Sequence, residues 1–171
     1  MGRGTCGRAA GFTLIELLVV LAIMGVLAGM VLPLGETLVR ARQERELKAA
    51  LWEIREALDA YKKAVDLGRI APGEAGSGYP PSLDALVAGV AATAPREGER
   101  SGEASGGPSV FYFLRRVPRD PLAAPDLPAQ ATWRLRSYAS PADGPEPGED
   151  VYDVRSSSDG LALDGSRYAD W

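Results

Sequence analysis

The stretch GFTLIELLVVLAIMGVLAGMVLPL, residues 11–34, decides how the chain is organised, and its single charged residue is Glu16. At a rise of about 1.5 Å per residue, a helix from Phe12 to Leu34 would be about 34 Å long. That length is enough to cross a hydrocarbon core of about 30 Å. The stretch therefore predicts a transmembrane helix with one acidic side chain near its N-terminal end.

The residues before this run carry Arg3 and Arg8 and no acid, which is typical of the basic region of an exported segment. A cleaved signal peptide fits poorly, because the run is long and no small-x-small cleavage site follows it. A plain single-pass anchor, with Glu16 snorkelling at the membrane edge, remains an alternative. Counting basic residues favours the opposite orientation, because four follow the run closely: Arg40, Arg42, Arg45 and Lys48.

Helical periodicity continues beyond the apolar run. Apolar residues recur every three or four positions and form one stripe: Leu47, Leu51, Ile54, Leu58, Tyr61 and Val65. We expect one helix from Phe12 to about Asp66, ended by Gly68. Either the chain's own C-terminal sheet or a coiled-coil partner could cover the stripe, and the short heptad run favours the sheet.

The second half of the chain is rich in glycine and proline and carries short strand signals. Ser82 is expected to cap a short helix whose residues Leu83, Leu86 and Val87 point inward. Residues 91–108 are predicted to form a surface loop. Strands are predicted at residues 110–114, 132–138 and 150–155, the last two as an antiparallel pair. The predicted fold class is α+β: a long N-terminal helix, transmembrane in its first half, packed on a small antiparallel C-terminal sheet of about three strands.

Composition excludes several kinds of chemistry. Among 171 residues there is no histidine, the commonest general base and transition-metal ligand, and the one cysteine, Cys6, cannot form an intrachain disulfide. No phosphate-binding loop, zinc spacing or nucleophile elbow is present, so we do not expect an enzyme. Arginines 115, 116 and 119 beside aromatic residues 111–113 could bind DNA, but the net charge of −4 does not favour nucleic acid.

The motif at residues 11–16 resembles the class III signal of type IV pilins and pseudopilins. The resemblance implies that a prepilin peptidase cleaves after Gly11 and methylates Phe12. Glu16 then becomes the fifth mature residue and Pro33 the twenty-second, as in that family. The implied organisation is a leader at residues 1–11, a transmembrane and assembly segment at 12–34, and a periplasmic pilin-like domain at 35–171.

The physical chemistry of the segment agrees with an assembly role. A carboxylate inside a bilayer costs about 2.5–3.5 kcal/mol, so Glu16 requires a partner, and the new amine of Phe12 on a neighbouring subunit could supply it. Gly25 and Gly29 form a G-x-x-x-G step that allows a second helix to approach closely. Pro33 removes one helical hydrogen bond. In the family the helix between the equivalents of Gly25 and Pro33 can melt during assembly.

The C-terminal half resembles the major pseudopilin of type II secretion in four places: residues 79–83, 114–121, 152–160 and 169–171. It departs at Leu122-Ala123-Ala124-Pro125, where that family has tryptophan-glycine-asparagine-proline. The resemblance implies a calcium ion in the C-terminal loop. Its ligands here would be Asp159, Asp164 and, more weakly, Asp170, because calcium prefers carboxylate and carbonyl oxygens. Without the resemblance, Asp-Gly is a turn signal.

The resemblance implies a structural subunit of a pseudopilus that drives type II secretion. Its expected partners are further copies of itself, minor pseudopilins, the prepilin peptidase, the inner-membrane assembly platform and, before assembly, membrane lipid. The expected location is the inner membrane with a cytoplasmic N-terminus, followed by a periplasmic filament. The alternative is a minor type IV pilin for adhesion, motility or DNA uptake; a membrane-anchored enzyme is more distant.

Overall fold

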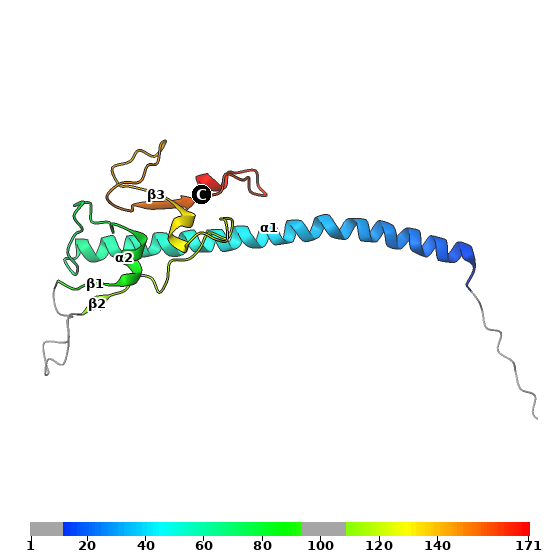
Figure 1. Cartoon of the computed structure of the whole chain (residues 1–171), viewed down its shortest axis with the longest axis horizontal. Helices are drawn as coiled ribbons and strands as arrows, with labels where there is room; N and C mark the ends of the chain where they lie inside the picture. Colours follow the sequence, from blue (N-terminus) through cyan, green and yellow to red (C-terminus); the bar gives the residue numbers. More distant parts are fainter. Residues whose placement is uncertain (1–11, 94–108) are drawn as a thin grey trace, which may run out of the picture. The chain divides into compact units, whose positions relative to one another are not determined.

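The computed structural model describes residues 12–93 and 109–171, without the side chains of residues 30–34. The described chain is α+β, as predicted, with one long helix before several short elements (Figure 1). Helix α1 spans Leu14–Asp66. The chain divides into two compact units, Met1–Ala41 and Arg42–Trp171. The expected continuous helix is confirmed, and it runs through Pro33 without a break.

Gly68 ends α1 as predicted. Its φ of +66° is a left-handed conformation that a glycine adopts without steric cost. The Gly68 N–H donates to the Val65 carbonyl at 2.8 Å, and the Arg69 N–H donates to the Ala64 carbonyl at 2.9 Å. These two bonds form a Schellman motif, which satisfies carbonyls that the last turn would otherwise leave unpaired.

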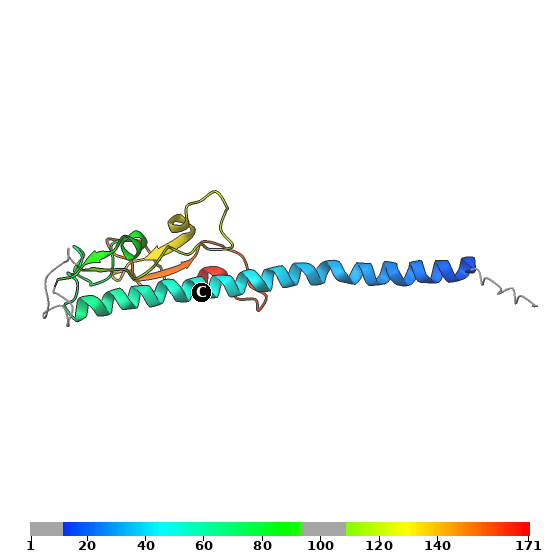
Figure 2. The same cartoon turned by 90° about the horizontal axis from the view of Figure 1, so that it is seen from below.

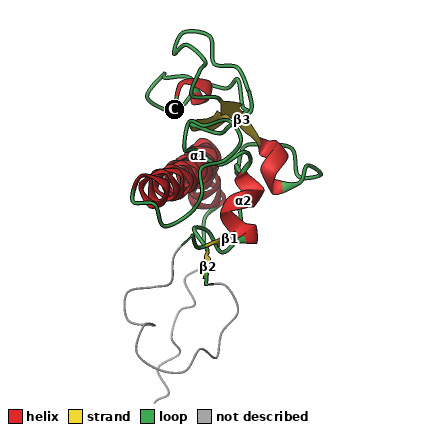
Figure 3. Ribbon diagram, turned by 90° about the vertical axis from the view of Figure 1, so that its left-hand side faces the viewer, coloured by secondary structure: helices red, strands yellow, loops and turns green. Residues whose placement is uncertain are grey.

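The apolar stripe of α1 is covered by the chain's own C-terminal part, as expected. Leu47 and Ile54 are completely buried, and the other members of the stripe are buried or half-buried. They share one core with buried residues from several later segments of the described chain: Ile70, Leu83, Leu86, Leu114, Val117, Trp133, Val151, Val154, Ala162 and Tyr168. Viewed along α1, the other elements of this unit surround part of the helix (Figure 3).

Helix α2 spans Leu83–Ala88 and turns Leu83 and Leu86 into the core, as predicted, while Val87 is half-buried. Ser82 occupies the N-cap position, as predicted, although its side chain makes no capping hydrogen bond. Strand β1, Val90–Ala91, pairs antiparallel with β2, Val110–Phe111. The predicted loop at 91–108 therefore overlaps a strand at its start, and residues 94–108 lie outside the described part.

Strands β3, Trp133–Arg136, and β4, Asp153–Ser156, form the predicted antiparallel pair, with Trp133 opposite Ser156 and Arg136 opposite Asp153. Figures 1 and 2 place this pair beside the part of α1 in the same unit. Two 3-10 turns, η1 Ala129–Thr132 and η2 Tyr168–Asp170, complete the elements.

The expectation of one sheet with about three strands is wrong for the described residues. They contain two separate sheets of two strands each. The strand predicted at residues 110–114 stops after Phe111, because the N–H groups of Phe113 and Leu114 both donate to the Leu86 carbonyl at 3.0 Å. Residues 113–114 are thereby attached to α2 instead of extending the ladder.

Candidate functional site

The start of α1 is held by a side-chain cap. The Glu16 N–H donates to Thr13 Oγ1 at 3.3 Å, and the Leu17 N–H donates to the Thr13 carbonyl at 3.2 Å. Thr13 is the N-cap and Glu16 is the third helical residue, so the two match the Thr-x-x-Glu capping box. Sequence reasoning missed this signal, although it is present in residues 13–16. The cap fixes Glu16 in the first turn, where the helix dipole favours a negative charge.

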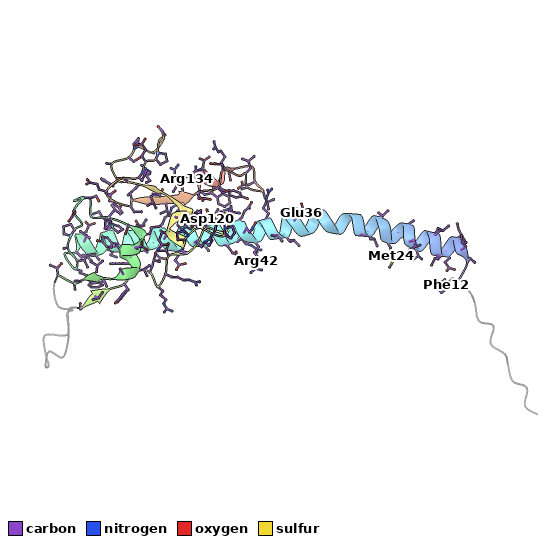
Figure 4. The ribbon with its side chains drawn as sticks, in the orientation of Figure 1. Phe12, Met24, Glu36, Arg42, Asp120 and Arg134 are labelled. Carbon is purple, nitrogen blue, oxygen red and sulfur yellow. The ribbon has the colours of Figure 1, made fainter. Side chains whose placement is uncertain are left out.

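The apolar side chains that follow are not covered by the described chain. From Phe12 to Leu27, the large apolar side chains are between 46% and 84% exposed. Phe12 and Met24 are labelled on this part of the helix in Figure 4. Across the described residues, no helical segment meets the length and hydropathy needed to cross a membrane.

The remaining predicted processing and assembly residues are only partly described. Gly11 lies outside the described residues, as does the side chain of Pro33. At Gly25 and at Gly29, an added Cβ atom would meet no atom within 4 Å apart from the neighbouring backbone of the helix itself. The space beside both glycines is therefore open to an approaching helix, as a G-x-x-x-G step requires.

The predicted calcium ligands lie in the C-terminal loop, which we define as residues 157–171. Asp159 Oδ1 accepts a hydrogen bond from Arg134 Nη2 on β3 at 2.9 Å, and the two form an exposed ion pair. Asp164 Oδ1 accepts from both the N–H and the Oγ–H of Ser166, at 2.9 and 2.6 Å. These bonds to Ser166 lower the pKa of Asp164 below its usual value.

Asp170 lies in η2. The three aspartates are not brought together, because the described residues contain no group of three or more acidic, histidine or cysteine side chains that could hold a metal ion. Calcium binding stays a prediction.

Sequence reasoning missed the residues of α1 that contact this loop. Glu44 Oε1 accepts hydrogen bonds from the Leu163 N–H at 2.8 Å and from the Tyr168 hydroxyl at 2.9 Å. Lys48 Nζ lies 4.2 Å from the centre of the Trp171 ring, within the range of a cation–π interaction. The partners lie more than a hundred residues apart in sequence, so no local pattern could have revealed them.

The chain resembles known proteins at its N-terminus and over most of its length. Residues 6–32 match the prokaryotic N-terminal methylation motif. Over 122 residues the chain is 34% identical to the type II secretion system core protein G of Aeromonas hydrophila, covering 69% of this chain and 71% of that protein. The chain belongs to the core protein G family. Its resemblance to G-type pseudopilins is thereby confirmed, and no solved structure gives a significant match.

In this chain, part of the basic aromatic segment at residues 111–119 is used for folding. Phe111 and Phe113 are packed against the core, while Tyr112 is 68% exposed. The Arg119 guanidinium donates to the carbonyl groups of Ala124 and Leu127 and so closes the turn at residues 120–127. This turn contains residues 122–125, which differ from the family's usual sequence. The hydrogen bonds of Arg119 stabilise the turn.

Proposed function

We propose that this chain is a structural subunit of a periplasmic pseudopilus that drives type II protein secretion. The observation that carries the proposal is the uncovered apolar surface between Phe12 and Leu27. Residues 42–171 bury a core of their own, so nothing in that unit's folding requires this surface. A large apolar surface of this kind needs either lipid or other protein chains to cover it.

The two coverings would follow each other in time. Before assembly, residues 12–34 lie in the inner membrane, with the N-terminus in the cytoplasm and the C-terminal domain in the periplasm. The prepilin peptidase then cleaves after Gly11 and methylates Phe12. Further copies of the chain replace lipid around the helix as the filament grows, together with minor pseudopilins and the inner-membrane assembly platform. The match over residues 6–32 supports the processing step.

Glu16 would set the position of each subunit. The Thr13 cap supports this role, because it holds the first turn closed and so limits the positions of the Glu16 carboxylate. In the filament the carboxylate would pair with the positive Phe12 amine of a neighbouring subunit. A carboxylate in an apolar surrounding without such a partner is costly, so wrongly placed subunits are disfavoured.

Mass spectrometry of the mature N-terminus tests the processing step, and we expect methylated Phe12. Filament yield from cells tests the pairing. Glu16→Ala and Glu16→Gln are both expected to abolish most assembly, because glutamine preserves the size and the capping pattern but not the charge. Glu36→Ala, which removes an exposed acid elsewhere on the same helix, is the matched control and should assemble normally. An intact Met1–Gly11 leader, or wild-type assembly of Glu16→Ala, would contradict the proposal.

A further inference from the structure

The C-terminal loop is closed by its own backbone. Leu161 and Arg167 form an antiparallel bridge. Inside it, the Ala162 N–H donates to the Ser166 carbonyl at 2.8 Å, and the Gly165 N–H donates to the Ala162 carbonyl at 3.0 Å. The loop is therefore a small hairpin with Asp164 in its turn, held by backbone hydrogen bonds within the loop.

One oxygen of each of the two main candidate aspartates, Asp159 and Asp164, is already engaged. Calcium requires six to eight oxygen ligands at about 2.3–2.6 Å. One oxygen of Asp159 faces the Arg134 guanidinium, whose positive charge also opposes a nearby cation. One oxygen of Asp164 serves two groups of Ser166, and Ser166 Oγ also accepts from Trp171 Nε1 at 2.8 Å. With one oxygen of each aspartate engaged, and no group of three or more acidic, histidine or cysteine side chains together among the described residues, this donor set fits calcium poorly.

The side of the loop that faces α1 presents hydrogen-bond donors. The Leu163 N–H and the Tyr168 hydroxyl both point at Glu44 Oε1, at 2.8 and 2.9 Å. A cation site needs the opposite arrangement, with carbonyl and carboxylate oxygens turned inward. Here the charged group that these donors face is an anion supplied by α1, and hydrogen bonds to a charged acceptor are stronger than neutral ones.

A second contact lies one helical turn further along α1. Lys48 is four residues after Glu44, so the two side chains lie on the same face of the helix. Its ammonium group lies over the Trp171 ring, and Trp171 packs edge-on against Tyr168 with ring centres 5.2 Å apart. The two charges of α1 thus contact the middle and the end of the loop, respectively.

We propose that Glu44 closes the C-terminal loop in place of calcium, so that the loop folds and stays docked on α1 without a bound metal ion. Glu44 is a positioning residue: it accepts from Leu163 and Tyr168 and thereby fixes the hairpin. The proposal concerns the folding of this loop alone and does not depend on filament assembly.

The test uses the full-length chain in detergent micelles, with millimolar calcium or with a chelator. We expect the same melting temperature for the wild type in both conditions. Glu44→Ala should lower it by about 5 °C or more, since two hydrogen bonds to a charged acceptor are lost. Glu44→Gln should have a melting temperature between those of the wild type and Glu44→Ala, because its amide oxygen can still accept hydrogen bonds. Glu46→Ala is the control, since Glu46 is exposed and bridges to Arg42 on its own helix; it should change little.

Tryptic cleavage after Arg167 gives a local readout, because the bridge between Leu161 and Arg167 must open before a protease can bind the backbone. Glu44→Ala should be cleaved about tenfold faster, in calcium and in chelator alike. Calcium that raises the melting temperature of the wild type, or that slows cleavage after Arg167, would overturn the proposal. So would unchanged cleavage in Glu44→Ala. If that variant does not fold, the calcium comparison on the wild type and on Glu44→Gln still decides.

Discussion

Arg55 Nε on α1 donates a hydrogen bond to Asp153 Oδ1, at the first residue of β4, over a distance of 2.8 Å. The same guanidinium donates through Nη2 to the Val154 carbonyl at 3.0 Å and to the Trp171 carbonyl at 2.7 Å. One side chain therefore connects the long helix to the β3–β4 sheet and to the C-terminal loop. The planar fork of arginine allows this, because it can serve several acceptors in fixed directions.

Replacing Arg55 by methionine should lower the free energy of unfolding by about 2 kcal/mol, measured by urea denaturation of the full-length chain in detergent. The apolar stem is kept, so the loss reports the three hydrogen bonds. Solvent reduces the effect, because the Arg55 side chain is 40% exposed.

Arg42→Met is the matched control for Arg55→Met. Arg42 pairs with Glu46 one turn away at 2.8 Å, and the two side chains are 77% and 52% exposed. Such surface pairs contribute about 0.5 kcal/mol or less. Equal losses for the two variants would show that the link from α1 to β4 does not stabilise the fold.

Asp120 is the second position with a large expected effect. Its side chain is completely buried, with Oδ2 accepting from Ser156 Oγ at 2.6 Å and Oδ1 accepting from the Leu122 N–H at 2.8 Å. Its own N–H donates to Thr132 Oγ1 at 3.2 Å. The residue therefore joins the turn after Pro118 to η1 and β4, and it is labelled in Figure 4.

Asp120→Ala should cost about 2–4 kcal/mol of unfolding free energy, because it leaves the buried Ser156 hydroxyl and the part-buried Leu122 N–H without an acceptor. Asp120→Asn should cost less, since its amide oxygen can still accept one bond. Thermal denaturation monitored by circular dichroism measures both. An alanine variant as stable as the wild type would mean that water or a rearranged turn satisfies these donors.

The sequence predicted the parts of the fold that local patterns encode. The stripe from Leu47 to Val65 follows the helical period, and Gly68 carries the signal for a helix end, so both were found. The β3–β4 pair was found because its strands alternate and are separated by a turn-rich segment. Strand β1 was missed, since two residues cannot show a period. The prediction of a single three-stranded sheet was wrong because the N–H groups of residues 113–114 donate to the Leu86 carbonyl and not to a neighbouring strand.

The candidate site divides in the same way. The motif at Gly11 to Glu16 is local, so the sequence alone pointed to the family. The contacts of the C-terminal loop are not local: Glu44 meets Tyr168 across a separation of 124 residues. An aspartate followed by glycine has the same appearance whether it binds a metal or makes a turn. Only the arrangement in space shows that Asp159 faces Arg134.

Gly89, the C-cap residue of α2, should tolerate substitution less well than Gly68, the glycine that ends α1. Its φ is +87°, and a Cβ atom there would lie 2.6 Å from Val110 Cγ1 and 2.7 Å from Tyr112 Cε1. Gly89→Ala should therefore cost about 2–3 kcal/mol, from backbone strain and from displacement of β2. At Gly68, φ is +66° and an added Cβ would meet no neighbouring group within 4 Å, so Gly68→Ala should lower the free energy of unfolding by only about 1 kcal/mol. Denaturant titration measures both unfolding free energies. Equal losses for the two variants would mean that β2 can shift away from the new Cβ at no cost.

Asp150 should make the free energy of unfolding of the domain decrease at acid pH. The residue is 4% exposed, and its Oδ1 accepts from Ser137 Oγ at 2.7 Å and from the Tyr138 N–H at 2.9 Å. Burial alone would raise the pKa of Asp150, but hydrogen bonds from Ser77, Ser137 and the Tyr138 N–H outweigh it and lower the pKa below its usual value. The folded state therefore binds this proton less readily than the unfolded state does.

Because the unfolded chain takes up the proton first, stability from Asp150 is fully present above the ordinary aspartate pKa of about 3.9. It is lost as the pH falls from there through the folded-state pKa. Asp150→Asn keeps an acceptor oxygen but has no charge, so it should be less stable than the wild type at pH 7, by about 1–2 kcal/mol. The gap should close as the pH falls from about 3.9 through the folded-state pKa, because the unfolded wild type takes up the proton first and the folded carboxyl is neutralised only at lower pH. Unfolding free energies of both proteins between neutral and acid pH measure this gap. A gap that stays constant across that range would show that Asp150 supports residues 137–138 through its shape and not through its charge.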